Sequence, residues 1–439
     1  MKLRKLSALA GASMLVFAAC STPPAASPGG SAAPGGSAGA PSSAAPSADT
    51  SKGTVKIAIE LPQQGSEKAA SDPIINGIKL AVKQAGGGAG GYKIDIPQSA
   101  IYDDALNGAH DAQTGANNMS QIVADPEIMA VIGPLNSSVA QAQIPISNEG
   151  GLLQCSPANT NPDLTKGAPA AQLRTKPNNY IRVVTTDDVQ GPAAAQYIYD
   201  VLGKKSVYVI DDTETFGKGV ADAFAAEFTK RGGNVVKHDA APKTTQDYVS
   251  IMTAAKALNP EAIYFGGVTA TGGARILLAA AQAGLGDVPY VGPDGINDGS
   301  GETKDSFLNL GAAAAKNSYS TLAGIGDFPG KAQFDADYKA EYGIDATGYA
   351  GTGYACAQVV INAIGRAGAA AADVAALREA VRVAGTATDE TYKTIVGDIT
   401  FNADGDTSQK IVSIYSVDPA AANGKGNWQF ETQVDYAAQ

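Results

Sequence analysis

The chain has 439 residues, more than one hydrophobic core usually serves, because single cores stop growing at about 250–300 residues. Its formal net charge is −11 and no Lys/Arg-rich run follows the N-terminal segment, which excludes the basic footprint of a nucleic-acid-binding protein. Hydrophobic residues make up 44%, and no stretch beyond that segment is apolar for long enough to span a bilayer, so we expect a globular body of two lobes.

The N-terminus has the pattern of an export signal. Lys2 and Arg4 precede a mostly apolar run at residues 6–19, and small residues come directly before Cys20. This resembles a lipoprotein signal, whose cysteine becomes the new N-terminus and carries acyl chains. We expect residues 1–20 to be a lipoprotein signal peptide and Cys20 the lipid anchor, which makes the protein extracytoplasmic and membrane-anchored. An ordinary secretory signal cleaved nearby is the alternative.

Residues 21–52 consist largely of Ala, Pro, Gly and Ser. Such a composition cannot bury enough apolar area to offset the loss of chain entropy. We predict a disordered tether between the anchor and the folded body.

From Thr54 onward, short β-branched runs alternate with longer amphipathic or Ala-rich segments, a pattern typical of βαβ units and parallel sheets. Strands are predicted at 55–61, 93–103, 128–135, 151–156, 180–184, 206–212, 234–240, 262–268, 288–292, 395–401 and 410–417. Helices are predicted at 73–84, 108–124, 189–202, 216–231, 247–258, 272–283, 332–342 and 353–366.

The pattern of alternating strands and helices restarts near residues 182–191, which indicates two similar lobes in series. We expect an α/β fold with two Rossmann-like lobes and parallel sheets. Two later helices and a hairpin pattern near residues 402–406 imply three crossings between the lobes, which together form the hinge. Lobe 1 is predicted to comprise 53–185 and 322–397, and lobe 2 to comprise 186–321 and 398–439.

Only two cysteines, Cys155 and Cys356, follow the signal. Both lie among small residues typical of buried positions, one at a predicted strand end and one in a predicted helix. We expect two free buried thiols; export would permit a bond between them as the alternative.

The candidate motifs for catalysis or metal binding lack the residues, spacing or order of elements that such sites require. His110 and His238 are the only histidines, and neither stands in a metal-ligand or triad spacing. Asn402, Asp404 and Asp406 lack the glutamate that completes a calcium loop, so a hairpin turn explains them better. A glycine-rich stretch at 86–91 precedes a strand instead of following one, unlike a dinucleotide site. We expect no enzyme activity, no cofactor and no metal.

Ligands of open α/β sheets bind at the carboxyl ends of the strands, where helix N-termini offer free N–H groups to an anion. Ser137 and Ser138 follow the strand at 128–135 and open a helix, so their hydroxyls and amides can hold a carboxylate. Three further segments follow strands in the same way: 156–160, 213–217 and 292–295.

These segments together resemble the leucine/isoleucine/valine-binding proteins, the substrate-binding subunits of branched-chain amino acid ABC transporters. The stretches, in matching order and spacing, are Gly-Pro-Leu-Asn-Ser-Ser, Ser-Pro-Ala-Asn-Thr, Asp-Asp-Thr-Glu-Thr-Phe-Gly-Lys-Gly, Tyr-Phe-Gly-Gly and Gly-Pro-Asp-Gly. The resemblance covers about 380 residues, essentially all that follow the tether, and implies the type I periplasmic-binding-protein fold.

The resemblance also implies a binding site for an amino acid. Ser137 matches the serine that binds the ligand carboxylate, and Ala158 and Thr160 match the pair that contacts carboxylate and ammonium. Asp294 matches the acid of the second lobe that pairs with the ammonium. The full predicted ligand set is Ser137, Ser138, Ala158, Asn159, Thr160, Phe216, Val268 and Asp294.

Two predicted ligand contacts depart from the family pattern. Phe216 stands where relatives often have a tyrosine, and Val268 replaces another aromatic residue. Together with Ala70 near the first loop, they predict a wider, apolar side-chain pocket. We expect a monomeric binding protein that closes on a zwitterionic ligand and delivers it to an ABC permease. A ligand-sensing lipoprotein, or a binder of amides, urea-like solutes or small carboxylates, is the alternative.

Overall fold

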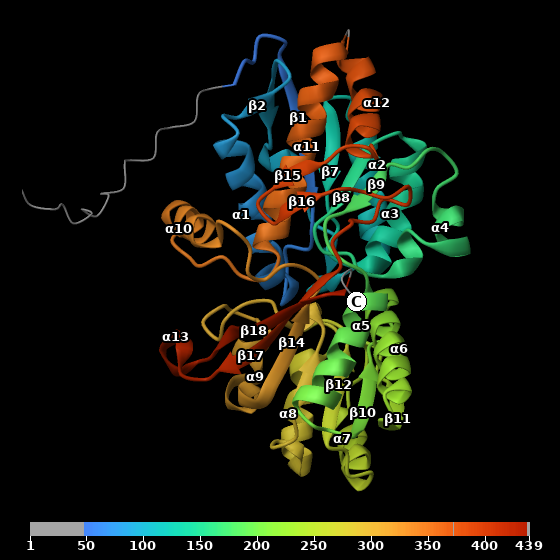
Figure 1. The fold of residues 1–439 in the computed structure, drawn as a ribbon, viewed down its shortest axis with the longest axis vertical. Helices are drawn as coiled ribbons and strands as arrows, with labels where there is room; N and C mark the ends of the chain where they lie inside the picture. The colour runs from blue at the N-terminus through green and yellow to red at the C-terminus, as the bar shows by residue number, and fades with distance from the viewer. Residues whose placement is uncertain (1–47, 372, 437–439) are drawn as a thin grey trace, which may run out of the picture. The chain divides into compact units, whose positions relative to one another are not determined.

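The computed structural model describes residues 48–371 and 373–436 (Figure 1). The predicted signal peptide, Cys20 and most of the predicted tether lie outside the described residues. The last part of that tether, residues 48–52, lies against the first lobe: the Lys52 amide donates to the Gly91 carbonyl at 2.8 Å. Among the described residues, no helix combines the length and the apolar character that crossing a membrane requires.

The first lobe contains a seven-stranded sheet in the order β2-β3-β1-β7-β8-β9, with β4 also paired to β1. All pairs are parallel except β2–β3. Its strands are β1 (Thr54–Glu60), β2 (Gly88–Ala89), β3 (Tyr92–Asp95), β4 (Ile101–Tyr102), β7 (Ile128–Ile132), β8 (Leu153–Ser156) and β9 (Tyr180–Arg182).

Helices cover both faces of this sheet because successive strand residues point to opposite sides. Ile57 and Ile59 pack on one side against α1, α11 and α12, whereas Ala58 between them packs on the other side with α2 (Figure 1). The helices of this lobe are α1 (Glu67–Gln84), α2 (Ala112–Ala124), α3 (Ser137–Glu149), α4 (Gly167–Leu173), α10 (Lys331–Tyr342), α11 (Ala350–Ala370) and α12 (Val374–Gly385).

The second lobe repeats this plan with the sheet order β11-β10-β12-β13-β14-β17-β18. The pairs up to β14 are parallel, and β17 and β18 are added antiparallel. Its strands are β10 (Ser206–Asp211), β11 (Asn234–Ala240), β12 (Ala262–Gly266), β13 (Tyr290–Gly292), β14 (Ser318–Leu322), β17 (Ile411–Asp418) and β18 (Asn427–Asp435).

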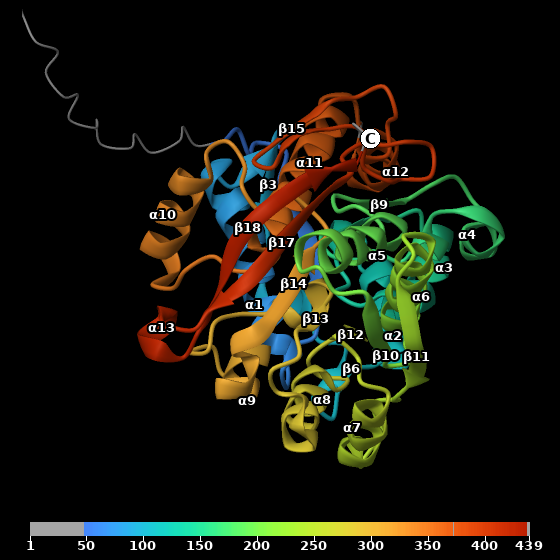
Figure 2. The ribbon, with the colours of Figure 1, turned by 60° about the horizontal axis from the view of Figure 1, so that its bottom comes forward.

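Alternation again divides the core of the second lobe into two faces. Val207 and Val209 of β10 pack with helices α5 and α6, while Tyr208 and Ile210 pack with α7 and α8 (Figure 2). The helices are α5 (Asp187–Gln196), α6 (Thr215–Lys230), α7 (Tyr248–Ala257), α8 (Gly273–Ala280), α9 (Phe307–Gly311) and α13 (Ala421–Gly424).

Three connections join the lobes, as the sequence predicted: β9 to α5, β14 to α10, and the segment before β17. They touch one another, because the Thr185 amide donates to the Ala323 carbonyl and Arg182 forms an isolated bridge with Asp406. Two small hairpins complete the fold: β5 (Ala105–Leu106) with β6 (Ala109–His110), and β15 (Tyr392–Thr394) with β16 (Gly397–Ile399).

Two predicted strands are wrong in extent. The strand expected at 93–103 breaks into β3 and β4 around Pro97, which cannot donate a ladder hydrogen bond. The strand expected at 395–401 is instead the turn and second arm of a hairpin, with Gly397 at φ 98°. The helix α12 and the strand β18 were not predicted.

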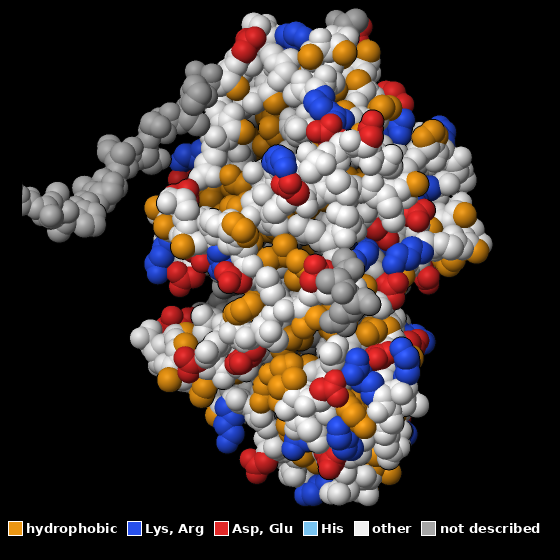
Figure 3. Space-filling view, viewed as in Figure 1, with side chains coloured by type: hydrophobic (Ala, Val, Ile, Leu, Met, Phe, Trp, Pro, Cys, Tyr) orange, Lys and Arg blue, Asp and Glu red, His pale blue; other side chains and the backbone are white. Residues whose placement is uncertain are grey.

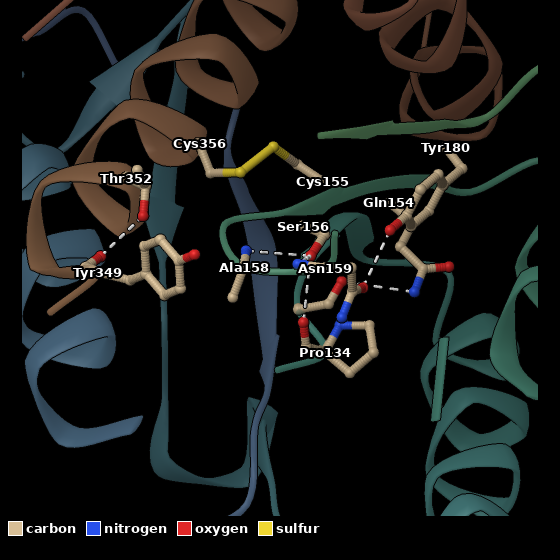
Figure 4. The surroundings of a disulfide bond; sticks show 11 residues. Pro134, Gln154, Cys155, Ser156, Ala158, Asn159, Tyr180, Tyr349, Thr352 and Cys356 are labelled. Atoms are coloured by element: carbon tan, nitrogen blue, oxygen red, sulfur yellow. Dashed lines mark hydrogen bonds between the residues drawn. A yellow bond between two sulfur atoms is a disulfide. The ribbon is translucent and has the colours of Figure 1, made fainter. Parts of the chain in front are cut away.

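The expectation of free thiols is also wrong. Cys155 of β8 and Cys356 of α11 form a disulfide, with their Cα atoms 5.9 Å apart and both residues fully buried (Figure 4). The two cysteines are 201 residues apart in sequence, so only the packing of α11 across the sheet brings them together.

Candidate functional site: the cleft between the lobes

A cleft lies where the carboxyl ends of both sheets meet, as expected for ligand sites in parallel α/β sheets. The space between its lining atoms is about 610 Å³, with the open solvent at its mouth included. Both lobes and the segment before α11 line it: Ser66, Glu67, Ala69, Ala70, Pro73, Leu135, Asn136, Ser137, Ala158, Phe216, Val268, Thr269, Asp294, Gly295, Asn297, Asp298, Thr347, Gly348 and Tyr349.

The first lobe presents the N-terminus of α3 to this cleft. Ser137 is the first residue of the helix and is 1% exposed, and the Asn136 side chain makes no capping hydrogen bond. Because the first N–H groups of a helix have no partner within it, they are available to an anion. Beside them, the Ser156 hydroxyl accepts from the Ala158 and Asn159 amides at 3.2 and 2.8 Å, which holds Ala158 at the cleft (Figure 4).

Three predicted ligand residues do not line the cleft. Ser138 is partly exposed and lies outside the lining. The side chain of Asn159 donates to a backbone carbonyl at 2.8 Å and accepts from the Tyr180 hydroxyl at 2.9 Å, so it stabilises the loop. Thr160 is fully buried, and its hydroxyl has no partner among the described residues. Its carbonyl accepts from the amide of Asp187, behind the cleft wall.

The second lobe contributes Asp294, directly after β13. Its Oδ1 atom is buried and has no hydrogen-bond partner among the described residues. Burial raises the pKa of Asp294 to about 6, although Gln190 and Tyr349 nearby lower it. Asp187 lies close enough to feel this charge: burial, and then the charge of Asp294, raise the pKa of Asp187 to about 8. Asp187 and Asp294 are therefore close enough for the charge of Asp294 to raise the pKa of Asp187, which the charge of Arg182 lowers.

The walls of the cleft are mostly apolar. Phe216 and Val268 of the second lobe are each 8% exposed and pack together with Val220. The opposite wall consists of Ala69, Ala70, Pro73 and Leu135. This surface suits the aliphatic part of a ligand.

Sequence reasoning missed a polar group at the edge of this apolar surface, formed by Glu67, Asn136 and Asp298. The strand-end rule that selected other segments would also have selected the loop after β1, which leads to Glu67. Asp298 stands only four residues after Asp294 in the same loop. Its burial raises the pKa of Asp298 to about 7.

His110 connects this part of the cleft to both lobes. Its Nδ1 lies 2.6 Å from Glu67 of its own lobe, and its Nε2 lies 3.6 Å from Glu214 of the other. Burial alone would lower the pKa of His110, but Glu67 and Glu214 raise it to about 10. The His110 ring in turn holds the pKa of Glu214 down to about 2. Lys243 of the second lobe also contacts Glu214, at 3.1 Å.

Further contacts join the lobes beside the cleft. The Asn161 side chain donates to the Thr215 carbonyl at 2.7 Å, and the Thr215 hydroxyl donates to Gln141 at 3.1 Å. The two lobes are therefore in direct contact through these hydrogen bonds.

Arg182 donates hydrogen bonds to the segment that follows Ala158. This arginine is fully buried and pairs with Asp406 of the third crossing at 2.7 Å. It also donates to the carbonyls of Asn159 and Asn161 at 3.2 and 2.7 Å. The hinge and the loop that carries Ala158 are thus held by one guanidinium, whose five donors match such a set of acceptors.

Comparison with known proteins agrees with this architecture. The family model described as "Periplasmic binding protein" matches residues 54–425. The Leu/Ile/Val-binding protein BraC3 of Rhizobium johnstonii is 29% identical over 367 residues, covering 82% of this chain and 91% of that protein.

Solved structures show the same fold. The leucine-binding protein LivK of Thermotoga maritima superposes with a TM-score of 0.74 at 26% identity, covering 88% of this chain and all of that one. LivJ of Streptococcus pneumoniae, a branched-chain amino acid transporter substrate-binding protein solved with isoleucine, superposes with a TM-score of 0.69 at 23% identity, covering 86% and 100%. From its sequence match, its two parallel-sheet lobes and the cleft between them, the chain belongs to the periplasmic binding protein family, with the type I fold and the leucine/isoleucine/valine-binding proteins among its relatives.

Proposed function

We propose that this protein is the lipid-anchored, extracytoplasmic substrate-binding component of an ABC importer and binds an α-amino acid in the cleft. One observation supports this most strongly: Ser137 and Ala158 of the first lobe line the same cleft as Asp294 of the second, whose Oδ1 atom has no hydrogen-bond partner among the described residues. A zwitterion taken from water needs both charges compensated. The first pair suits a carboxylate, and Asp294 suits an ammonium.

The mechanism follows from the division of these groups between the lobes. The ligand carboxylate binds first at the N-terminus of α3, and hinge closure brings Asp294 and Phe216 over it. Because only the closed form offers both sets of contacts, the ligand favours closure by its difference in affinity for the two forms. The closed form then docks on the permease, as a monomer held to the membrane through Cys20.

The names of the relatives support an amino acid as ligand. BraC3 is named for leucine, isoleucine and valine, and other curated relatives are named for leucine alone or for leucine, isoleucine, valine, threonine and alanine. On this fold other ligands also occur, since a Rhodopseudomonas palustris protein was solved with benzoate at 20% identity. Asp294 argues against a simple carboxylate here, because such a ligand leaves the acid without a partner.

Calorimetric titration against a panel of amino acids tests the proposal. At least one should bind, and Asp294→Asn should weaken that binding by about a hundredfold or more, because the ammonium would lose its counter-charge while staying buried. Asp287→Asn changes an exposed aspartate of the same lobe and serves as the matched control. No binding of any amino acid, or equal binding by the Asp294→Asn variant, would contradict the proposal.

A second experiment tests the anchor. In cells that make the protein, the wild type should partition with membranes and incorporate labelled fatty acid, whereas Cys20→Ser should do neither. Labelling of the variant at the wild-type level would exclude Cys20 as the anchor.

A further inference from the structure

The polar edge of the cleft contains hydrogen-bond acceptors without partners, and they come from both lobes. Asp298 of the second lobe is 4% exposed; its Oδ1 accepts from the Phe307 amide at 2.8 Å and its Oδ2 has no partner among the described residues. Asn136 of the first lobe is 5% exposed; its Nδ2 donates to Glu67 at 3.1 Å, which leaves its Oδ1 without a partner. Both residues line the cleft.

The orientation of the Asn136 amide is fixed by its neighbour. A carboxylate only accepts, so the NH₂ group must face Glu67 and the oxygen must face away. Two buried acceptors, one a carboxylate, therefore require donors that the described part of the protein does not supply. An unpartnered buried acceptor destabilises the folded protein, and more so when it is charged.

The ionisable side chains that line the cleft also favour a ligand with positive charge. Its ionisable acids are Glu67, Asp294 and Asp298, and it contains no Lys, Arg or His. The nearest histidine, His110, is already engaged by Glu67. An α-amino acid with an apolar side chain has a single ammonium, which would meet Asp294 and leave Asp298 without a counter-charge.

We propose that the ligand is a basic α-amino acid of the lysine type, whose side-chain ammonium is received by Asp298 and Asn136. This inference rests on the proposed function, which assigns the α-carboxylate and α-ammonium to Ser137, Ala158 and Asp294. The methylene groups of such a side chain lie between the apolar walls, with Ala70 and Leu135 on one side and Val268 on the other. An aliphatic stem against an apolar surface with its charge at a polar end is the usual arrangement of a lysine side chain.

A comparison of lysine with norleucine tests the inference on the wild-type protein. Norleucine has the same carbon skeleton and lacks only the terminal ammonium. Calorimetric titration should show lysine binding at least tenfold more tightly, because a charge-assisted hydrogen bond forms only with lysine. Equal or tighter binding of norleucine would overturn the inference.

The Asp298→Asn variant tests whether Asp298 causes the difference in affinity between lysine and norleucine. The asparagine oxygen can still accept from the Phe307 amide, so the loop keeps its hydrogen bond. The variant should lose the preference for lysine and bind norleucine within about threefold of the wild type, while Asp287→Asn keeps the wild-type ratio. A preference for lysine that persists in a folded Asp298→Asn protein would overturn the role of Asp298.

The two proposals fail in distinguishable ways. If norleucine or leucine binds tightly and lysine does not, the basic side chain is excluded and the amino-acid function stands. If neither lysine nor any other amino acid binds, the proposed function itself falls, and this inference falls with it.

Discussion

At the scale of single residues, the main distinction is between acids that hold a turn and acids kept without a partner. Asp211 and Asp212 accept from the Thr213 and Glu214 amides at 2.8 and 3.0 Å and stabilise the loop that carries Phe216. The buried Oδ1 atom of Asp294, by contrast, accepts no hydrogen bond from any described residue. An acid that the fold leaves unpartnered at a cleft is a candidate for ligand binding.

The pH dependence of binding follows from Asp294. Its pKa is raised to about 6 by burial, and an ammonium prefers the ionised form. The affinity for an amino acid should therefore rise up to about tenfold per pH unit below pH 6 and level off above it, with proton release on binding near that pH. Titrations in buffers of different ionisation enthalpy measure the release.

The control for this prediction is Asp294→Asn, which should bind weakly and show no step at pH 6. The neighbouring Asp187, whose pKa burial and then the charge of Asp294 raise to about 8, should titrate at a lower pH in this variant because the charge of Asp294 is gone. An affinity independent of pH between 4 and 7 in the wild type would contradict the role of an ionised Asp294.

The disulfide is the other feature of residue scale. It closes a loop of 201 residues, for which chain entropy gives a stabilisation of about 5 kcal/mol as an upper value. The Cys155→Ala, Cys356→Ala double variant should lose about 2–5 kcal/mol in free energy of unfolding, measured by urea denaturation. Reductant in denaturant should lower the stability of the wild type and leave the variant unchanged. An unfolding midpoint shared by both proteins would contradict a stabilising bond.

At the scale of elements, the first lobe depends on the close packing of α1 against α11, which together with the disulfide holds one wall of the cleft. The helices approach through glycines: a Cβ on Gly353 would lie 2.7 Å from the Ile74 carbonyl oxygen, and one on Gly77 would lie 2.2 Å from that of Ala350. No real Cβ fits at such distances from backbone, so a larger residue must separate the helices.

Two substitutions in the same helix separate packing from helix propensity. Gly353→Ala should lower the free energy of unfolding by about 1–3 kcal/mol through overpacking. Gly365→Ala, where a Cβ would make only an ordinary contact at 3.8 Å, should be neutral or stabilising by up to about 1 kcal/mol. Thermal unfolding of both variants checks this. Equal effects at the two positions would show that the helix contact is not limiting.

At the scale of the whole molecule, charged and polar contacts join the two lobes. His110 faces Glu67, Glu214 and Lys243, and burial is offset by the two acids so that its pKa rises to about 10. Because this pKa is raised above the unfolded value, the stabilisation is complete below about pH 6.5 and is lost as pH rises towards 10.

Glu214→Gln should therefore favour opening. The substitution removes one of the two charges that face His110 and the partner of Lys243, so the ligand-free protein should have a larger radius of gyration by X-ray scattering and bind ligand more weakly. Glu149→Gln, which removes an exposed pair with Lys176 within the first lobe, is the control. An unchanged radius and affinity in Glu214→Gln would show that this contact does not set the balance between open and closed forms.

The surface of the molecule carries side chains of both charges. Acidic and basic side chains are interspersed over the face shown in Figure 3, with no continuous basic area on that face. This is consistent with the net charge of −11 and with a small-molecule ligand in place of a polyanion.

Features that depend on local patterns could be predicted from the amino-acid sequence. Alternating strand and helix periods predicted the two lobes and the three crossings, because apolar spacing is set by which face each element buries. Ser137 and Asp294 follow predicted strands, and the rule that ligands bind at the carboxyl ends of parallel strands therefore selected their segments as candidate sites.

Contacts between segments that are distant in sequence could not be predicted, because they depend on how the helices and lobes pack. Cys155 meets Cys356, and His110 meets Glu214, because helix and lobe packing bring them together. The Oδ1 atom of Asn136 and the Oδ2 atom of Asp298 have no hydrogen-bond partner among the described residues, and this likewise depends on every neighbour that surrounds them in three dimensions. Hydrogen-bond satisfaction is a property of the assembled environment, and no spacing in the sequence encodes it.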